Sequence, residues 1–141
     1  MRRVLLALGH VWTAPNTIAM WALAKATRCR WVFRGAEGML VYDGSSSRAW
    51  RWWARRWGMT ALTVGAVVVV ARPWSSVGNV QRLLVHEQRH VVQALILGPF
   101  YLPVYLLLCA YGPLHGRHWY RDHPLELDAR AAEDHACPAR G

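Results

Sequence analysis

The stretch NVQRLLVHEQRHVVQALILGP, residues 79–99, decides how this chain is organised. Asparagine is a residue type that begins helices by accepting a backbone hydrogen bond, and Asn79 stands before an apolar, periodic run. At the other end, Gly98 permits the left-handed turn that commonly ends a helix, and Pro99 prevents continuation. The stretch therefore predicts one helix over residues 80–97.

This helix carries the pattern His-Glu-x-x-His. Residues four apart lie on one face of a helix, so His86 and His90 can both reach one metal ion. Leu83 and Ala94 share that face, so the histidines are expected to point inward, where a zinc ion would satisfy both. Glu87 lies about 100° around the helix, a place suited to the general base for zinc-activated water. The alternative is a core helix whose histidines bind backbone carbonyls and whose glutamate is on the surface.

A catalytic zinc ion needs a third protein ligand and a position for water. The segment HPLELDARAAE, residues 123–133, predicts a helix with His123 at its cap and Glu126 in its first turn. An apolar helix over residues 101–111, with Gly-Pro breaks at both ends, allows the chain to return. Glu126 is therefore expected to fold against the two histidines. A rival arrangement uses His118 or His123 as the third ligand.

The segments HEQRHVVQ and HPLELDA together resemble the gluzincin group of zinc metallopeptidases. They are more closely similar to small bacterial minigluzincin-like proteins, whose motifs are matched by Gln93, Pro124 and Ala129 and by the Gly-Pro after the first helix. The segment TAPNTIAMWALA also resembles the first helix of such proteins. The resemblance implies a zincin-like fold and one Zn²⁺. It implies zinc ligands at His86, His90 and Glu126 and a catalytic base at Glu87.

The chain departs from these motifs at two positions. His123 stands where the minigluzincin motif has asparagine, and Arg130 stands where many larger gluzincins have an aspartate that orients one histidine. Asp128 and Asp134 are the alternatives for that orienting role. The candidates to donate a hydrogen bond to the oxyanion of a tetrahedral intermediate are His118, Tyr120 and His123.

A small β-sheet is predicted before the histidine helix. Residues 30–44 are typical of two short strands around a glycine-rich turn, and residues 60–71 of one long strand or a hairpin near Gly65. Beside a zinc site, a sheet edge can hold an extended peptide, although a buried core strand is the alternative. The expected fold is α+β, with a small sheet packed on the metal-binding helix and two or three further helices. One zincin-like domain is expected over residues 1–141.

The composition of the chain indicates a membrane surface as one candidate partner. The chain combines a net charge of +9 with 54% hydrophobic residues and nine tryptophans. Such a chain suits a membrane surface, or a core beneath a basic shell. Residues 48–57 predict a helix whose tryptophans face either the core or the headgroup level of a membrane. No nucleic-acid motif accompanies the charge, so nucleic acid is not an expected partner.

Two segments, residues 4–24 and 91–116, carry no charge apart from histidine and are each about long enough to span a bilayer. Prolines interrupt both, which fits a hairpin in one leaflet or two core helices. The N-terminal run has no small-x-small cleavage site, and the three cysteines form no disulfide framework. A cytoplasmic or membrane-associated protein is therefore expected.

The expected function is zinc-dependent hydrolysis of a peptide or protein substrate. The alternative is a membrane-surface protein with a structural zinc site or none.

Overall fold

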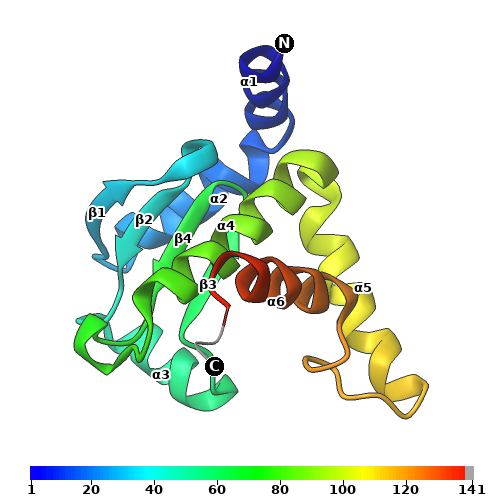
Figure 1. The fold of residues 1–141 in the computed structure, drawn as a ribbon. Coiled ribbons are helices and arrows are strands. Elements are labelled where there is room, and N and C mark those ends of the chain that lie inside the picture. Colours follow the sequence, from blue (N-terminus) through cyan, green and yellow to red (C-terminus); the bar gives the residue numbers. More distant parts are fainter. Residues whose placement is uncertain (139–141) are drawn as a thin grey trace.

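The computed structural model describes residues 1–138, and residues 139–141 lie outside this part. The helices are α1 (Arg2–Trp12), α2 (Ala14–Ala26), α3 (Arg48–Trp57), α4 (Val80–Leu97), α5 (Tyr101–Leu114) and α6 (Pro124–Ala136). The strands are β1 (Arg30–Arg34), β2 (Leu40–Asp43), β3 (Ala61–Val64) and β4 (Val67–Val70). The strands form one sheet in the order β1-β2-β4-β3, with α2 and α4 on its two sides (Figure 1). The predicted α+β class is confirmed.

Strand β4 is the centre of the hydrophobic core. It pairs in parallel with β2 and antiparallel with β3, and its four valines are all buried. Val67 and Val69 pack with α2 and α3, whereas Val68 and Val70 pack with α4. A strand covered on both faces reads as a continuous apolar run, which explains why the sequence shows no alternation here.

The β3–β4 connection is a tight hairpin, one of the two predicted arrangements. Gly65 has a φ of 63°, which favours glycine, and a Cβ there would lie 2.6 Å from the Thr17 backbone nitrogen. The Ala66 N–H donates to the Thr17 hydroxyl at 3.0 Å, which fixes the turn on α2. The hairpin leaves β3 at the edge of the sheet beside α4.

Helix α4 begins and ends where its caps predict. The Asn79 side chain accepts from the Arg82 N–H at 3.0 Å, and Gly98 ends the helix with a φ of 56°. Helix α5 continues past the predicted Gly-Pro stop to Leu114, because a proline in the last turn removes only one helical donor. Helix α6 lies across α4 (Figure 1).

Helix α3 places its tryptophans on the core rather than leaving them all outside. Trp50 is 4% exposed and donates from its indole N–H to the Thr27 hydroxyl at 2.8 Å. Trp53 packs on the same core cluster, whereas Trp52 is 62% exposed. The core interpretation of this helix is therefore confirmed for Trp50 and Trp53.

The fold has more helices than the two or three predicted around the histidine helix. The uncharged segment 4–24 breaks at Thr13 into α1 and α2, and α1 projects from the body with every residue at least partly exposed (Figure 1). The helical stretch Val80–Leu114 is long and apolar enough to cross a membrane by length and composition, and 33% of its apolar window is buried. By that test it is compatible with a membrane span or a core helix.

Candidate metal centre

Helix α4 presents His86 and His90 on the face that meets α6. The His90 side chain is buried, and that of His86 is 12% exposed. Their Nε2 atoms lie 3.2 Å apart. The spacing of one helical turn thus brings two imidazole nitrogens to one point.

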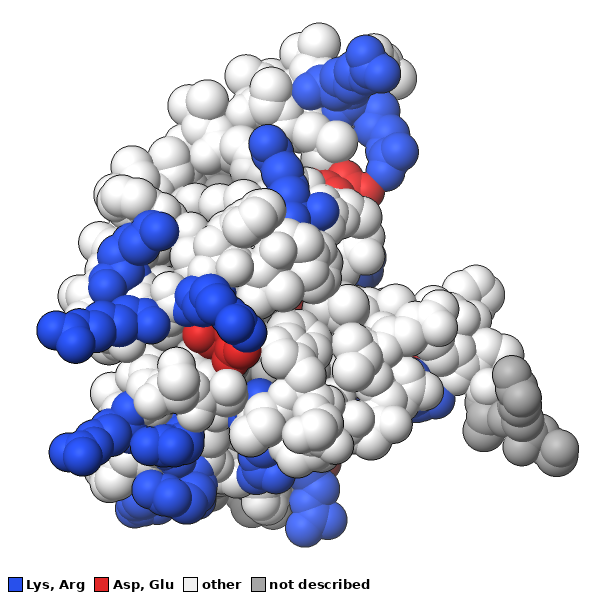
Figure 2. All heavy atoms as spheres, turned by 90° about the vertical axis from the view of Figure 1, so that its left-hand side faces the viewer, with Lys and Arg blue, Asp and Glu red and all other residues white. Residues whose placement is uncertain are grey.

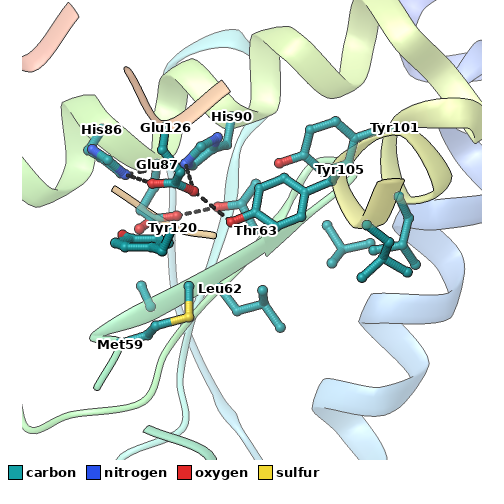
Figure 3. A pocket seen from close by; sticks show the side chains of 14 residues that line it. Met59, Leu62, Thr63, His86, Glu87, His90, Tyr101, Tyr105, Tyr120 and Glu126 are labelled. Atoms are coloured by element: carbon teal, nitrogen blue, oxygen red, sulfur yellow. Dashed lines mark hydrogen bonds and ion pairs between the residues drawn. The ribbon is translucent and has the colours of Figure 1, made fainter. Parts of the chain in front are cut away.

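Helix α6 brings Glu126 to the same point. The helix begins at His123, whose Nδ1 accepts from the Leu125 N–H at 3.2 Å. In the first turn, Glu126 is 2% exposed, and its side chain lies beside those of His86 and His90 (Figure 3). Its Oε1 lies 3.2 Å from His90 Nε2, and its Oε2 lies 3.3 Å from His86 Nε2. Ligand atoms of the three side chains therefore lie within 4.8 Å of one another.

This donor set fits a zinc ion. Two imidazole nitrogens, one carboxylate oxygen and a free position are typical of catalytic zinc sites. Donors bound tetrahedrally to one Zn²⁺ are about 3.3 Å apart, which matches the distances between the three side chains. Among the described residues, Glu126 Oε2 is buried and has no hydrogen-bond partner, despite its 3.3 Å distance from His86. A cation at this point would satisfy that oxygen.

The charges of the cluster favour a cation. Burial lowers the pKa of His90, but the hydrogen bond to Glu126 and the charges of Glu87 and Glu126 outweigh burial and raise it to about 9. Burial raises the pKa of Glu126, but His86, His90 and Tyr105 outweigh burial and hold it well below its usual range. The same carboxylates that hold a proton on His90 would attract a metal ion.

A second set of side chains orients both imidazoles. His90 Nδ1 lies 2.9 Å from Gln93 Oε1, and His86 Nδ1 lies 3.2 Å from Glu133 Oε2. An acceptor at each Nδ1 favours a proton there, which leaves each Nε2 lone pair directed at the shared point. Gln93 is itself held, because its side-chain amide donates to Asp128 at 2.7 Å.

Glu133, rather than Asp128 or Asp134, meets a histidine directly. Asp128 binds Gln93 and Arg89, and Asp134 pairs with Arg82 at 2.5 Å. Arg82 also donates to Glu133 at 2.7 Å. Glu133 stands two helical turns after Glu126 and so shares its face of α6. That spacing is the signal by which the sequence could have identified it.

Glu87 lies beside the histidines and points toward β3. It is 5% exposed, and its Oε2 accepts from the Thr63 hydroxyl at 2.6 Å (Figure 3). A charge-assisted hydrogen bond of this kind holds the carboxylate in one orientation. Thr63 is not among the residues predicted from the sequence, because the alternation of β3 identifies it only once the helix that faces β3 is known.

Tyr120 is the one predicted oxyanion donor that lines the cleft beside the cluster. Burial and the negative charge of Glu126 raise the pKa of Tyr120, so its hydroxyl keeps its proton. Arg130, which stands in place of the orienting aspartate, holds this loop. Its guanidinium donates to the backbone carbonyls of Tyr120 at 3.2 Å and Arg121 at 2.7 Å.

The other two predicted donors have different contacts. His123 caps α6 through Nδ1, and its Nε2 lies 3.0 Å from the Tyr105 carbonyl oxygen. Burial lowers the pKa of His123, which fits a neutral ring that donates from Nε2. His118 accepts at Nδ1 from the N–H groups of Tyr120 and Arg121. His118 and His123 are not among the residues that line the cleft.

The cleft passes the cluster between β3 and α5. Its apolar part is lined by Leu62, Tyr101, Leu102, Tyr105 and Leu106. Its polar part is lined by Thr60, Asn79 and Arg82. His86, Glu87 and Tyr120 line both parts. The candidate metal centre therefore lies where the apolar and polar parts of the cleft meet.

Strand β3 supplies one wall of this cleft with a free backbone edge. The Ala71 N–H donates to the Thr60 carbonyl at 2.9 Å, which sets the register of the hairpin. Backbone bonding alternates along an antiparallel pair, so Ala61 and Thr63 direct their N–H and C=O groups away from β4. These groups are positioned to pair with an extended peptide.

Comparison with known proteins gives no relative. No protein-family model matches this chain, and no curated protein or solved structure matches it. The resemblance to minigluzincins rests on two sequence motifs, and the function has to be inferred from the cluster and its cleft.

Proposed function

We propose that this chain is a zinc-dependent metallopeptidase with a gluzincin-like zincin domain. The convergence of His86, His90 and Glu126 around one point, with Glu87 beside them, carries the proposal. Among residues 1–138 this cluster offers three donor side chains and borders a cleft. Three ligands with access to water suit a catalytic zinc site, whereas a structural site is closed by a fourth protein ligand.

The proposed roles follow from the contacts. Zinc held by His86, His90 and Glu126 would act as a Lewis acid that lowers the pKa of water and polarises a carbonyl. Glu87 accepts a proton from the attacking water and passes it to the leaving nitrogen. The water oxygen bonds to the carbonyl carbon, the C–N bond breaks, and a carboxylate and an amine result. Tyr120 donates to the carbonyl oxygen as charge develops on it.

The shape of the cleft supports a peptide substrate. An extended peptide can add to the open edge of β3 through the backbone groups of Ala61 and Thr63. One of its apolar side chains then lies in the part of the cleft lined by Leu62, Leu102 and Leu106. Backbone pairing accepts many sequences, so the apolar part of the cleft supplies the preference for one side chain.

Glu87→Gln tests this proposal. The variant should lose about a hundredfold or more of the hydrolysis of an unstructured protein such as casein, because the general base is removed. Zinc, measured by elemental analysis, should remain near one ion per chain in the purified variant. Glu37→Gln makes the same chemical change at a carboxylate that pairs with Arg2 and should leave both values unchanged. Full activity in Glu87→Gln, or no zinc in the parent protein, would overturn the proposal.

The alternative is that zinc only joins α4 to α6. X-ray absorption at the zinc edge distinguishes the two functions, because it counts the ligands. Three protein ligands and one water oxygen support the peptidase, whereas four protein ligands support the structural role.

A further inference from the structure

Helices α1 and α5 expose an unusual amount of apolar surface. Large apolar side chains on α1, at the end of α4, in the turn Gly98–Phe100 and on α5 are more than half exposed, among them Leu5, Leu8, Ile96, Phe100, Leu107 and Leu114. The outward faces of α1, the turn Gly98–Phe100 and α5 are called the α1–α5 surface here. The two helices join through Trp12 and Phe100, whose ring centroids lie 6.1 Å apart.

The α1–α5 surface has a one-sided charge pattern. Residues 1–36 and 88–121 contain no Asp or Glu. Basic side chains stand at both ends of the surface, with Arg3 at the start of α1, beside the Arg2–Glu37 pair, and Arg117 after the end of α5. Basic side chains also predominate on the side of β1 and α3, which faces away from α5 (Figure 2), so the net charge of +9 is spread over more than this surface. This pattern complements an anionic partner.

The lengths of the helices favour lying on a bilayer over crossing it. Helix α5 has 14 residues. At 1.5 Å per residue it reaches about 21 Å, which is short of the roughly 30 Å hydrocarbon core. Helix α4 cannot add to this length, because it is packed on the sheet and carries the buried His90 and Glu87. Trp12 and Tyr111 are residue types that suit the headgroup level.

A second copy of the chain fits this surface less well. Two copies would bring Arg3 and Arg117, which pair with no acidic side chain of the described residues, close to each other. The surface itself supplies no acidic residue to lie between them, because Glu37 already pairs with Arg2. Helix α1 also projects from the body (Figure 1), so the surface is not flat. An anionic bilayer accepts a projecting apolar helix and neutralises the arginines.

We propose that the α1–α5 surface docks this protein on an anionic lipid bilayer. The outward faces of α1 and α5 lie at the boundary of headgroups and acyl chains, and the flanking arginines contact phosphates. Leu102 and Leu106 are 38% and 58% exposed on α5 and also line the apolar part of the cleft. The cleft therefore opens at the bilayer surface. If the proposed peptidase function holds, its substrates are peptide segments that lie at a membrane.

Flotation of the full chain with lipid vesicles tests the docking without reference to activity. The parent protein should float with vesicles of phosphatidylcholine and phosphatidylglycerol, less in high salt, and much less with phosphatidylcholine alone. The double variant Leu8→Glu/Leu107→Glu should partition about tenfold more weakly or worse, because two apolar contacts are replaced by charges that the lipid repels. Circular dichroism checks that it is folded.

Trp52→Glu is the matched control, since Trp52 is a similarly exposed apolar residue on α3. It should bind vesicles like the parent. The docking proposal is wrong if the parent does not float or if the double variant floats as well as the parent. It is also wrong if Trp52→Glu alone abolishes binding, because α3 would then be the docking helix. A concentration-dependent dimer in sedimentation that the double variant abolishes would assign the surface to a second copy instead.

One peptide in two forms tests the position of the cleft. It is offered free in solution and anchored to anionic vesicles by an acyl chain. The parent should cleave the anchored form faster, and the double variant should lose this advantage while keeping its rate on the free form. If the parent cleaves neither form, the proposed peptidase function is wrong, and the docking result still stands. Equal rates on both forms by a vesicle-bound parent would reject the membrane substrate class.

Discussion

The α4–α6 contact and the α1–α5 surface are opposites in composition. Five of the eight acidic residues lie on α4 and α6, where Arg82 and Arg89 pair with three of them. The α1–α5 surface has no acidic residue and little burial. Directional polar contacts fix side chains to within a fraction of an ångström, whereas apolar contacts tolerate many partners. The contrast is the basis of two separate proposals, hydrolysis at the α4–α6 contact and docking at the α1–α5 surface.

Removing a proposed zinc ligand from the α4–α6 contact should have the largest effect on zinc content and hydrolysis. His90→Ala removes a proposed ligand and leaves Glu126 with less compensation. Zinc per chain should fall toward zero, and hydrolysis should fall by about a thousandfold or more. The measurements are elemental analysis and initial rates. His135→Ala, at an exposed histidine near the end of α6, is the control and should match the parent. Normal zinc content in His90→Ala would place the ion elsewhere.

Two substitutions to alanine, one in each region, compare how much the α4–α6 contact and the α1–α5 surface contribute to the free energy of unfolding. Val91 is fully buried on α4, whereas Leu107 is 69% exposed on α5. Val91→Ala should lower the free energy of unfolding by about 2 kcal/mol, roughly thirtyfold in the equilibrium constant. Leu107→Ala should change it by no more than about 0.5 kcal/mol. Urea denaturation without lipid measures both, and similar losses would mean that the α1–α5 surface is part of the core.

Arg130 tests how firmly the polar region holds the loop over the cleft. Arg130→Met removes the hydrogen bonds to the Tyr120 and Arg121 carbonyls and so loosens Tyr120. We expect kcat to fall about tenfold with zinc content unchanged, because Tyr120, the proposed oxyanion donor, loses its position. Arg117→Met, at an exposed arginine in the same loop, should leave kcat at the parental value. A change in KM alone would assign Arg130 to substrate binding.

A further prediction is a pH dependence of stability in the metal-free protein. The negative charges around His90 raise its folded-state pKa to about 9 from its ordinary value of 6.5. The stabilisation that protonated His90 adds to the free energy of unfolding is therefore fully present below about pH 6.5 and is lost as the pH rises through about 9. With a chelator present, the melting temperature should fall as the pH rises over this range, and His90→Ala should reduce this pH dependence. Zinc should also flatten it, because a coordinated imidazole is neutral.

Local signals explain how much of the fold the sequence predicts. Asn79, Gly98 and His123 mark helix ends through contacts with neighbouring residues, so the limits of α4 and the start of α6 are predicted correctly. The four valines of β4 look the same in a long strand and in a hairpin, so the sequence leaves both open. Only the packing of Gly65 on Thr17 decides between them.

The residues of the candidate site also divide into those that local spacing predicts and those that depend on tertiary packing. The positions of His86 and His90 follow from helical spacing, and the return of α6 brings Glu126 to them. Thr63 could not be assigned from the sequence, and Glu133 could be assigned only once α6 was known to face α4 through Glu126, because each acts across an interface between two elements. Their roles depend on which face of β3 and of α6 meets α4, and this is a property of tertiary packing.

The strand order β1-β2-β4-β3 also bears on the order of folding. The pairs β1–β2 and β3–β4 join neighbours in the sequence, so each can close over a short connection. Parallel pairing of β2 with β4 has to enclose α3 and β3 and is the slower event. We expect two preformed hairpins to dock late, with the edge strand beside the cleft already joined to its neighbour when they meet.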